Sequence, residues 1–393
     1  MAADLLKENR RFTAILVGVL LASGCVSALP VVWEKIVGRG VDVIRVEANS
    51  PLARHVYSGD VILSCDSQEI RGPAHFDRIL AEHELSRPLH CRALRGGVLP
   101  FEFKIPVDKL PERPLNRAWD YRVAPGRRIR ARGTYGHFVT YAEVMLQLAA
   151  LAFGLWFAYP HKWTPVGIGL CLVALLLVGG LAATLTRASL AALVLASLAV
   201  AWVKLGRWLR LAALPLAALL LLGLDRLLVE WRGFGFYNPA DLSMQYRQMM
   251  WEDGWRLIQT HPWLGIGMDS VLLRWKELEV RAFGQLGLHS HFHSTPVQIA
   301  VERGLLGLAA WLFLMGSYLW LLIRLVEQTR QSVDWWKHGL ALGIFAALVG
   351  FLASGLVHYN FGDSEVVMVF WLLAGVAAAL SYRTRAAPAP PAS

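Results

Sequence analysis

Hydrophobic runs recur along most of the 393-residue chain. They cover residues 12–33, 138–159, 163–183, 188–203, 209–224, 304–323, 339–358 and 366–382. An α-helix needs about 20 mostly apolar residues to span the hydrocarbon core of a bilayer. The pattern therefore predicts a polytopic α-helical membrane protein with about eight transmembrane helices, the first acting as an uncleaved anchor.

Between the first two runs the pattern changes to short alternating segments, turns rich in glycine and aspartate, and mixed charge. Strand patterns at 41–46, 59–64, 89–94 and 101–105 and a helix pattern at 75–83 predict a small soluble αβ domain. Cys65 and Cys91 both fall in this segment and could pair if it is exported.

A cluster of arginines follows the αβ segment with no acid between them: Arg122, Arg127, Arg128, Arg130 and Arg132. Such a cluster can bind anionic lipid headgroups, or one or two of its members can help to hold a diphosphate. The expected organisation is an anchor at 1–33, the αβ domain at 34–112, a basic juxtamembrane linker at 113–137, a membrane domain at 138–382 with a large loop at 225–303, and a disordered tail at 383–393.

Composition and charge agree with a membrane protein. Apolar residues make up 55% of the chain and the formal net charge is +10. Much of the positive charge lies beside hydrophobic runs, which favours contact with membrane lipids or a phosphate-bearing substrate over nucleic acid.

The short loops set the orientation through the excess of lysine and arginine on cytoplasmic sides. If the N-terminus is cytoplasmic, that side holds Lys7, Arg10, Arg11, Lys162, Lys204, Arg207, Arg210, Arg324, Arg330, Lys337, Arg383 and Arg385. The opposite short loops hold Arg187 alone. Both termini are then cytoplasmic, and the αβ domain and the large loop face outward.

Three histidines alternate at the end of the large loop: His289, His291 and His293. Imidazoles two apart on an extended segment point to one side and could ligate a metal. One of them could instead act as a general base or donate to phosphate, or all three could be solvated loop residues. Gly304 and Gly307 shortly afterwards could serve only close helix packing.

Spacing links these residues to a known family. His293-Ser294, nine residues, and Gly304-x-x-Gly307 with Glu302 before the glycines resemble the signature of the bacterial O-antigen ligase and O-antigen polymerase-like membrane glycosyltransferases. The segment from Thr184 to Arg187 resembles the family's Thr-x-Ser-Arg, with threonine replacing serine. Arg247 through Gly267 is similar to its loop of Arg, Trp and Pro-x-Leu-Gly-x-Gly. The stretch from Arg130 through Gly136 into Tyr141 and Ala142 is a weaker fourth match, and the resemblance covers about residues 130–382.

The resemblance implies transfer of a polyprenyl-diphosphate-linked glycan, such as one on undecaprenyl diphosphate, to an acceptor at the periplasmic face of the bacterial inner membrane, as in lipopolysaccharide biosynthesis. It implies an inverting, metal-independent enzyme that needs no cofactor. His293 is then the catalytic candidate, Arg187 and Arg247 bind the diphosphate, and His291, Arg132 and Glu302 are supporting candidates. Gly304 and Gly307 are the structural motif.

The sequence does not identify the acceptor. Lipid A-core would make the protein a ligase, a growing glycan a polymerase, and a protein acceptor a protein O-oligosaccharyltransferase. Residues 36–110 resemble a bacterial PDZ domain through Asn49-Ser-Pro-Leu-Ala followed by Gly59-Asp-Val-Ile. A non-enzymatic membrane scaffold that recruits an envelope protein through this domain is the alternative of another class.

Overall fold

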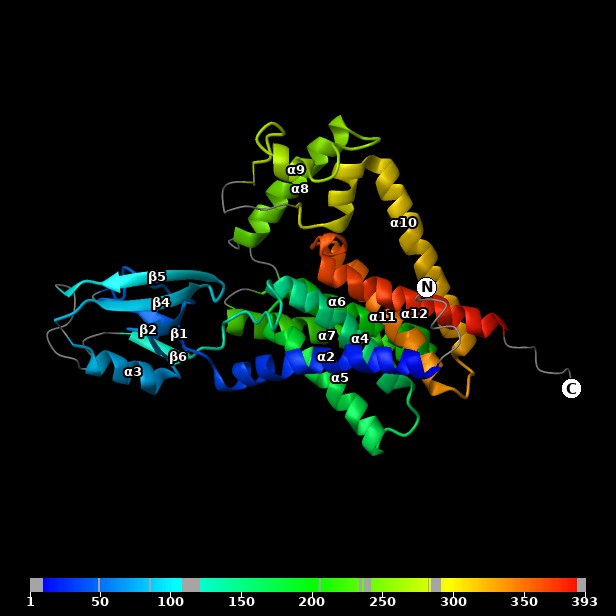
Figure 1. Cartoon of the computed structure of the whole chain (residues 1–393), viewed down its shortest axis with the longest axis horizontal. Coiled ribbons are helices and arrows are strands. Elements are labelled where there is room, and N and C mark those ends of the chain that lie inside the picture. Colours follow the sequence, from blue (N-terminus) through cyan, green and yellow to red (C-terminus); the bar gives the residue numbers. More distant parts are fainter. Residues whose placement is uncertain are drawn as a thin grey trace, which may run out of the picture.

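The computed structural model describes residues 10–48, 50–84, 86–107, 121–204, 206–232, 235–236, 242–281, 283 and 291–386. Asn49, His289 and parts of the expected linker and tail lie outside these residues. Figure 1 shows a helical body with a small sheet at one end and a lobe beside it that contains α8 (Leu242–Thr260) and α9 (Ser270–Arg274). Helix α10 (Thr295–Thr329) leads from the lobe to the body.

The other helices of the body follow the hydrophobic runs. They are α2 (Arg10–Val37), α4 (Phe138–Ala158), α5 (Pro165–Ala183), α6 (Arg187–Lys204), α7 (Arg207–Arg232), α11 (Trp335–Gly355) and α12 (Ser364–Ala386). Within the described ranges, seven helices are long and apolar enough to cross a membrane, and α6 is a shorter apolar helix. The polytopic helical class is confirmed: the chain is a multi-pass membrane protein.

Helices α4 and α11 form the centre of the body. In each of them, 83% of the most hydrophobic window is buried inside the protein. Their backbones approach closely where small residues meet, because a Cβ added to Gly154 would lie 2.2 Å from the backbone nitrogen of Gly343. Glycine at this crossing permits the close packing that holds membrane helices together.

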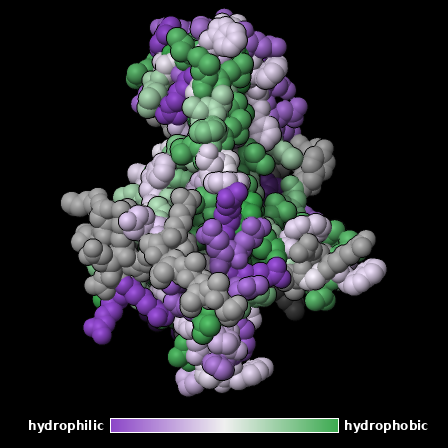
Figure 2. Space-filling view, turned by 90° about the vertical axis from the view of Figure 1, so that its right-hand side faces the viewer, coloured by the Kyte–Doolittle hydropathy of each residue, from purple (hydrophilic) through white to green (hydrophobic). Residues whose placement is uncertain are grey.

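The two ends of the body are marked by contacts of α2. At one end Arg10 forms an ion pair with Asp334, the N-cap of α11, at 3.2 Å. At the other end Ser27 lies 3.3 Å from Thr134, just before α4. Figure 2 looks onto the end away from the sheet, where hydrophilic residues gather near the middle of a face that also carries hydrophobic residues. The Arg10 end and the Thr134 end are therefore opposite ends of one helical body.

The αβ part contains an antiparallel sheet with the strand order β5-β4-β2-β1-β6, and β3 (Gln68–Glu69) pairs with β2. The strands are β1 (Val41–Val46), β2 (Val61–Cys65), β4 (Leu89–Arg95), β5 (Leu99–Ile105) and β6 (Tyr121–Pro125), and the helix is α3 (Pro73–Glu82). Val41, Ile62, Phe76, Leu89 and Ile105 are fully buried and form its own core. Cys65 and Cys91 face each other on β2 and β4 and form a disulfide.

The structure differs from the expected boundaries at three places. Strand β6 pairs with β1, so the sheet reaches into the stretch expected to be a linker. The alternation in that strand is short and its arginine suggested a headgroup contact instead. Helix α7 continues to Arg232, and α10 begins at Thr295, so both ends of the expected 225–303 loop are helical. Pro296 in the first turn suits a helix start there.

Candidate functional site

Residues 291–293, here called the histidine segment, are held in place by the backbone of Phe292, which lies between His291 and His293. Phe292 is fully buried, its N–H donates to Gln298 Oε1 at 2.8 Å, and its carbonyl accepts from Trp251 Nε1 at 3.0 Å. The rings of His291 and His293 lie 4.3 Å apart, edge to face. His289 lies outside the described residues, so the structure brings together His291 and His293.

His293 has an unusual backbone conformation. Its φ is +48°, in the left-handed region that non-glycine residues rarely adopt, and its N–H donates to His291 Nδ1 at 3.2 Å. Such conformations persist where surrounding structure holds them and cluster at functional sites. The bonds at Phe292 supply that support.

His291 and His293 line a cavity of about 80 Å³ together with residues of α4 and of the segment between α11 and α12. The lining residues are His137, Val139, Thr140, Glu143, His291, His293, His358, Tyr359, Asn360 and Asp363. Four imidazoles and two carboxyl groups therefore meet in one place. In the described part of the chain, no three of the potential metal-ligating groups converge as ligands of one ion would.

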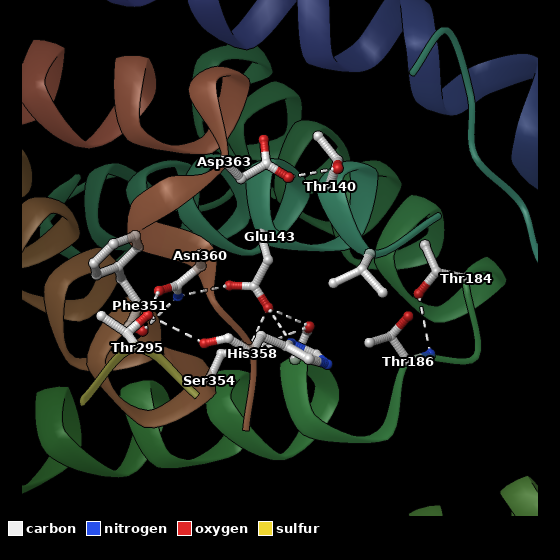
Figure 3. A network of polar contacts seen from close by, with 12 residues as sticks. Thr140, Glu143, Thr184, Thr186, Thr295, Phe351, Ser354, His358, Asn360 and Asp363 are labelled. Atoms are coloured by element: carbon white, nitrogen blue, oxygen red, sulfur yellow. Dashed lines mark hydrogen bonds and ion pairs between the residues drawn. The ribbon is translucent and has the colours of Figure 1, made fainter. Parts of the chain in front are cut away.

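A buried carboxylate organises one wall of the cavity. Glu143, on α4, is 1% exposed and accepts hydrogen bonds from Ser189 (2.8 Å), Ser354 and His358 Nδ1 (2.9 Å) at one oxygen. Its other oxygen accepts from Asn360 at 3.2 Å. Figure 3 shows Ser354, His358 and Asn360 around the carboxylate of Glu143. With Nδ1 donating to the carboxylate, the Nε2 of a neutral His358 is left as an acceptor.

The same network ties the histidine segment to the membrane core. Thr295, at the start of α10, donates its N–H and its hydroxyl to the carbonyl of His358, both at 3.1 Å. The Thr295 hydroxyl also lies 3.0 Å from Asn360 Oδ1, and Asn360 donates to the Phe351 carbonyl at 2.8 Å (Figure 3). Thr295, two residues after His293, therefore links the backbone of the histidine segment to that of His358.

The rim of the cavity contains groups whose pKa values depart from their usual ones. Burial lowers the pKa of His137, with Arg130 and His358 adding to the effect. Burial also raises the pKa of Tyr359 and that of Asp363, whose carboxylate accepts from Thr140 at 2.6 Å. Each shift favours the neutral form, as expected where water is partly excluded.

Arg187 lies at the start of α6 and is 8% exposed. Its guanidinium donates to the carbonyl of Gly235 at 2.5 Å, next to the segment that follows α7. Two residues further along α6, Ser189 donates a hydrogen bond to Glu143. The segment from Thr184 to Arg187, here called the Arg187 motif, therefore shares a wall with the cavity lined by His291 and His293, here called the histidine cavity. Figure 3 shows Thr184 and Thr186 beside that wall.

Arg247 lies on α8, one turn before Trp251, whose indole bonds to the carbonyl of Phe292. Residues four apart lie on one face of a helix. Arg247 therefore belongs to the face of α8 that packs toward the histidine segment.

Arg132 does not line the histidine cavity. It is exposed and lines a separate groove together with its neighbour Arg130. Arg130 instead contacts the Arg187 motif: it donates to the Thr184 carbonyl at 3.0 Å and to the Thr186 hydroxyl at 3.2 Å.

The two glycines of the histidine motif mark a break in α10. Gly304 has φ +68° and ψ −175°, and the turn 262–267 packs into the break. The N–H groups of Ile266 and Gly267 donate to the carbonyls of Val301 and Glu302 at 2.9 and 3.0 Å. In return, the N–H of Leu305 donates to the Pro262 carbonyl at 2.7 Å.

Glu302 strengthens this junction, because its carboxylate accepts from the N–H of Asp269 at 3.1 Å. At Gly307, one turn past the break, an added Cβ would lie 2.4 Å from the Cβ of Arg303, so the local backbone leaves room only for glycine. Two motifs far apart in sequence, Pro-x-Leu-Gly-x-Gly and Gly-x-x-Gly, are therefore one backbone-to-backbone joint.

Sequence reasoning missed Glu143, His358 and His137. Glu143 gave a usable signal, because an ionisable residue inside a hydrophobic run is a functional candidate by default. His358 ends a predicted span and His137 precedes one, and nothing in their positions along the chain links them to each other or to His293.

Residues 171–312 match the family model described as O-antigen ligase. The match contains Arg187, Arg247, His291, His293 and both glycines of the break in α10. The resemblance to this family is thus confirmed over these residues. No curated protein matches the chain.

Proposed function

We propose that this protein, whose residues 171–312 match the O-antigen ligase family model, transfers a polyprenyl-diphosphate-linked glycan to an acceptor hydroxyl at the periplasmic face of a bacterial inner membrane. The observation that carries the proposal is the cavity where His293 meets the His358–Glu143 pair. It lies beside the segment that matches the family, at the end of the body opposite Arg10.

The chemistry needs a nucleophile and a stabilised leaving group. The acceptor oxygen forms a bond to the anomeric carbon, the bond from that carbon to the diphosphate oxygen breaks, and its electron pair leaves with the diphosphate. Direct displacement inverts the configuration at this carbon. The diphosphate already activates the sugar, so the protein has to position the reactants and neutralise charge.

Arg187 and Arg247 are proposed to bind the diphosphate. A guanidinium forms paired hydrogen bonds to phosphate oxygens and keeps its charge. Arg187 shares a wall with the cavity through Ser189, and Arg247 lies on the face of α8 directed to the histidine segment. Neither arginine lines the cavity itself, and we propose that both contact the diphosphate beside it.

His293 is proposed to accept the proton of the attacking hydroxyl. It lines the cavity, and the backbone bonds of Phe292 hold its loop. His358 would orient the hydroxyl through Nε2, since Glu143 fixes the other nitrogen as a donor. Residues His291, Glu302, Gly304 and Gly307 would act by holding the segment in place.

Orientation rests on three observations. The positive charges of the short loops favour a cytoplasmic N-terminus. The site lies at the opposite end of the body from Arg10. The Cys65–Cys91 disulfide suits an oxidising compartment such as the periplasm.

Glycan profiling of a deletion strain tests this function. We expect loss of polysaccharide-bearing lipopolysaccharide and accumulation of the lipid-linked glycan, both reversed by the wild-type gene and not by His293→Ala. Lipopolysaccharide carrying a single repeat would identify a polymerase, and unglycosylated envelope proteins a protein O-oligosaccharyltransferase. Unchanged glycans in the deletion strain would refute the proposal.

A further inference from the structure

The histidine cavity is too small for the body of a substrate. Its volume is about 80 Å³, whereas ligand sites in proteins usually measure about 300–1,000 Å³. The cavity can admit the reacting groups, and the rest of a saccharide substrate must lie in adjoining space.

A groove of about 600 Å³ lies between the αβ part and the helical body. It is bounded by the end of α2, by the sheet residues Leu63 and Leu94, and by the segment that leads into α4. His137 lines both this groove and the histidine cavity. The groove therefore ends where the proposed reaction takes place.

The groove continues onto the sheet. A second hollow of about 500 Å³ shares Arg39, Leu63, Leu94 and Pro100 with it. Together they form one elongated depression from the face of β2, β4 and β5 to the start of α4. No residue of α3 lines either hollow among the described residues, so this is not the site between a strand and a helix where a PDZ domain would bind a peptide.

Its charges suit an anionic, hydroxyl-rich chain. The part near the membrane contains Arg39, Arg130 and Arg132 against one acid, Glu34. Arg39 lies 4.0 Å from Glu34 and 3.9 Å from Glu69, but its side chain is 54% exposed. Exposed ion pairs contribute little, so an incoming phosphate could replace them. Further along, Ser64, Arg92 and Glu102 add polar groups for hydroxyls.

We propose that this groove binds the phosphorylated saccharide of the acceptor and presents its end at His137 to the histidine cavity. The αβ domain thereby becomes one wall of the acceptor site. The identification of this ligand as the acceptor rests on the proposed function, but binding in the groove can be measured without turnover. Arg39 and Arg132 are its recognition residues.

The test measures binding of the phosphorylated core oligosaccharide released from lipopolysaccharide to the full chain in lipid nanodiscs. We expect Arg39→Ala/Arg132→Ala to weaken binding at least tenfold. Arg78→Ala, which removes an exposed arginine on α3 outside the groove, should bind like the wild type. His293→Ala should also keep its binding, which separates this site from catalysis.

Further ligands identify what the groove recognises. The dephosphorylated oligosaccharide should bind more weakly to the wild type and should lose less affinity in the double variant. Equal binding by the double variant and the wild type would overturn the proposal even if the protein transfers glycan. An equal loss of affinity of the double variant for glycan-free polyprenyl diphosphate would also overturn it and would assign the groove to the donor. An equal loss of affinity for a peptide would overturn it as well.

Discussion

Nδ1 of His358 lies 2.9 Å from the carboxylate of Glu143, and both side chains are buried at the end of the helical body opposite Arg10. Glu143 also accepts hydrogen bonds from Ser189, Ser354 and Asn360. A buried carboxylate with this many donors fixes the imidazole that it contacts, as the third group of a catalytic constellation does.

Replacing this carboxylate should impair the chemical step. Glu143→Gln keeps the size of the side chain but removes the charge and places an amide among donors. We expect kcat for transfer to fall at least tenfold with the KM for donor little changed, and the pH profile to shift. Steady-state kinetics on the folded enzyme measures this.

The matched control is Gln147, one turn along α4, which donates to the Val366 carbonyl at 3.1 Å. Gln147→Leu also breaks a buried hydrogen bond and should lower the thermal midpoint without changing kcat. An equal loss of kcat in both variants would show that packing of α4, and not the Glu143–His358 contact, explains the effect.

The joint between α10 and the turn 262–267 makes a prediction about stability. A Cβ at Gly304 would lie 2.1 Å from the carbonyl oxygen of Trp263, and φ there is +68°. Gly304→Ala should therefore cost more than about 1–3 kcal/mol and lower the thermal midpoint in detergent. Gly316→Ala, in the same helix with nothing within 4 Å, should be neutral or stabilising. Equal midpoints for the two variants would argue against the joint.

His137 predicts how acid affects stability. Its pKa is lowered in the folded protein, chiefly by burial, and its Nδ1 accepts from the N–H of Val139 as the N-cap of α4. Below the usual histidine pKa of about 6.5, the unfolded chain binds a proton that the folded chain rejects, so stability falls as pH falls.

His137→Asn keeps a capping side chain but cannot titrate. The thermal midpoint of the wild type should therefore drop more than that of the variant between about pH 7.5 and pH 5.5. His161→Asn, at an exposed position, should follow the wild type. Parallel curves for wild type and His137→Asn would contradict the assignment.

The disulfide predicts both stability and location. Cys65 and Cys91 are 26 residues apart, and closing a loop of this size stabilises a fold by about 3 kcal/mol. Cys65→Ser/Cys91→Ser should lower the stability of the αβ domain, whereas Cys171→Ser should not. In protein from intact cells, alkylation before reduction should spare both cysteines. Free Cys65 and Cys91 would contradict an exported αβ domain.

Much of the fold followed from local pattern. Hydrophobic runs identified the membrane helices, because each must satisfy its backbone internally over about 20 apolar residues. The strands at 41–46 and 89–94 followed from alternation. Strand β6 did not, because its pairing with β1 depends on a partner some 80 residues away.

The candidate site was only partly accessible to sequence reasoning. Spacing singled out His293 and Arg187, which the structure places on two walls of one region through Ser189 and Glu143. It assigned Arg132 near the reaction, and the structure places that side chain in the groove beside the αβ domain. Contacts such as that between Glu143 and His358 arise from helix packing, and no regular sequence spacing predicts them.

Transfer by the purified full chain in nanodiscs tests the central claim most directly. The assay supplies a polyprenyl-diphosphate-linked glycan and lipid A-core and measures the glycosylated acceptor for wild type, His293→Ala, Arg187→Ala and Arg247→Ala. We predict product from the wild type, and a loss of about 10²-fold or more for His293→Ala, as expected for removal of a general base. Full transfer by all three variants would contradict this account.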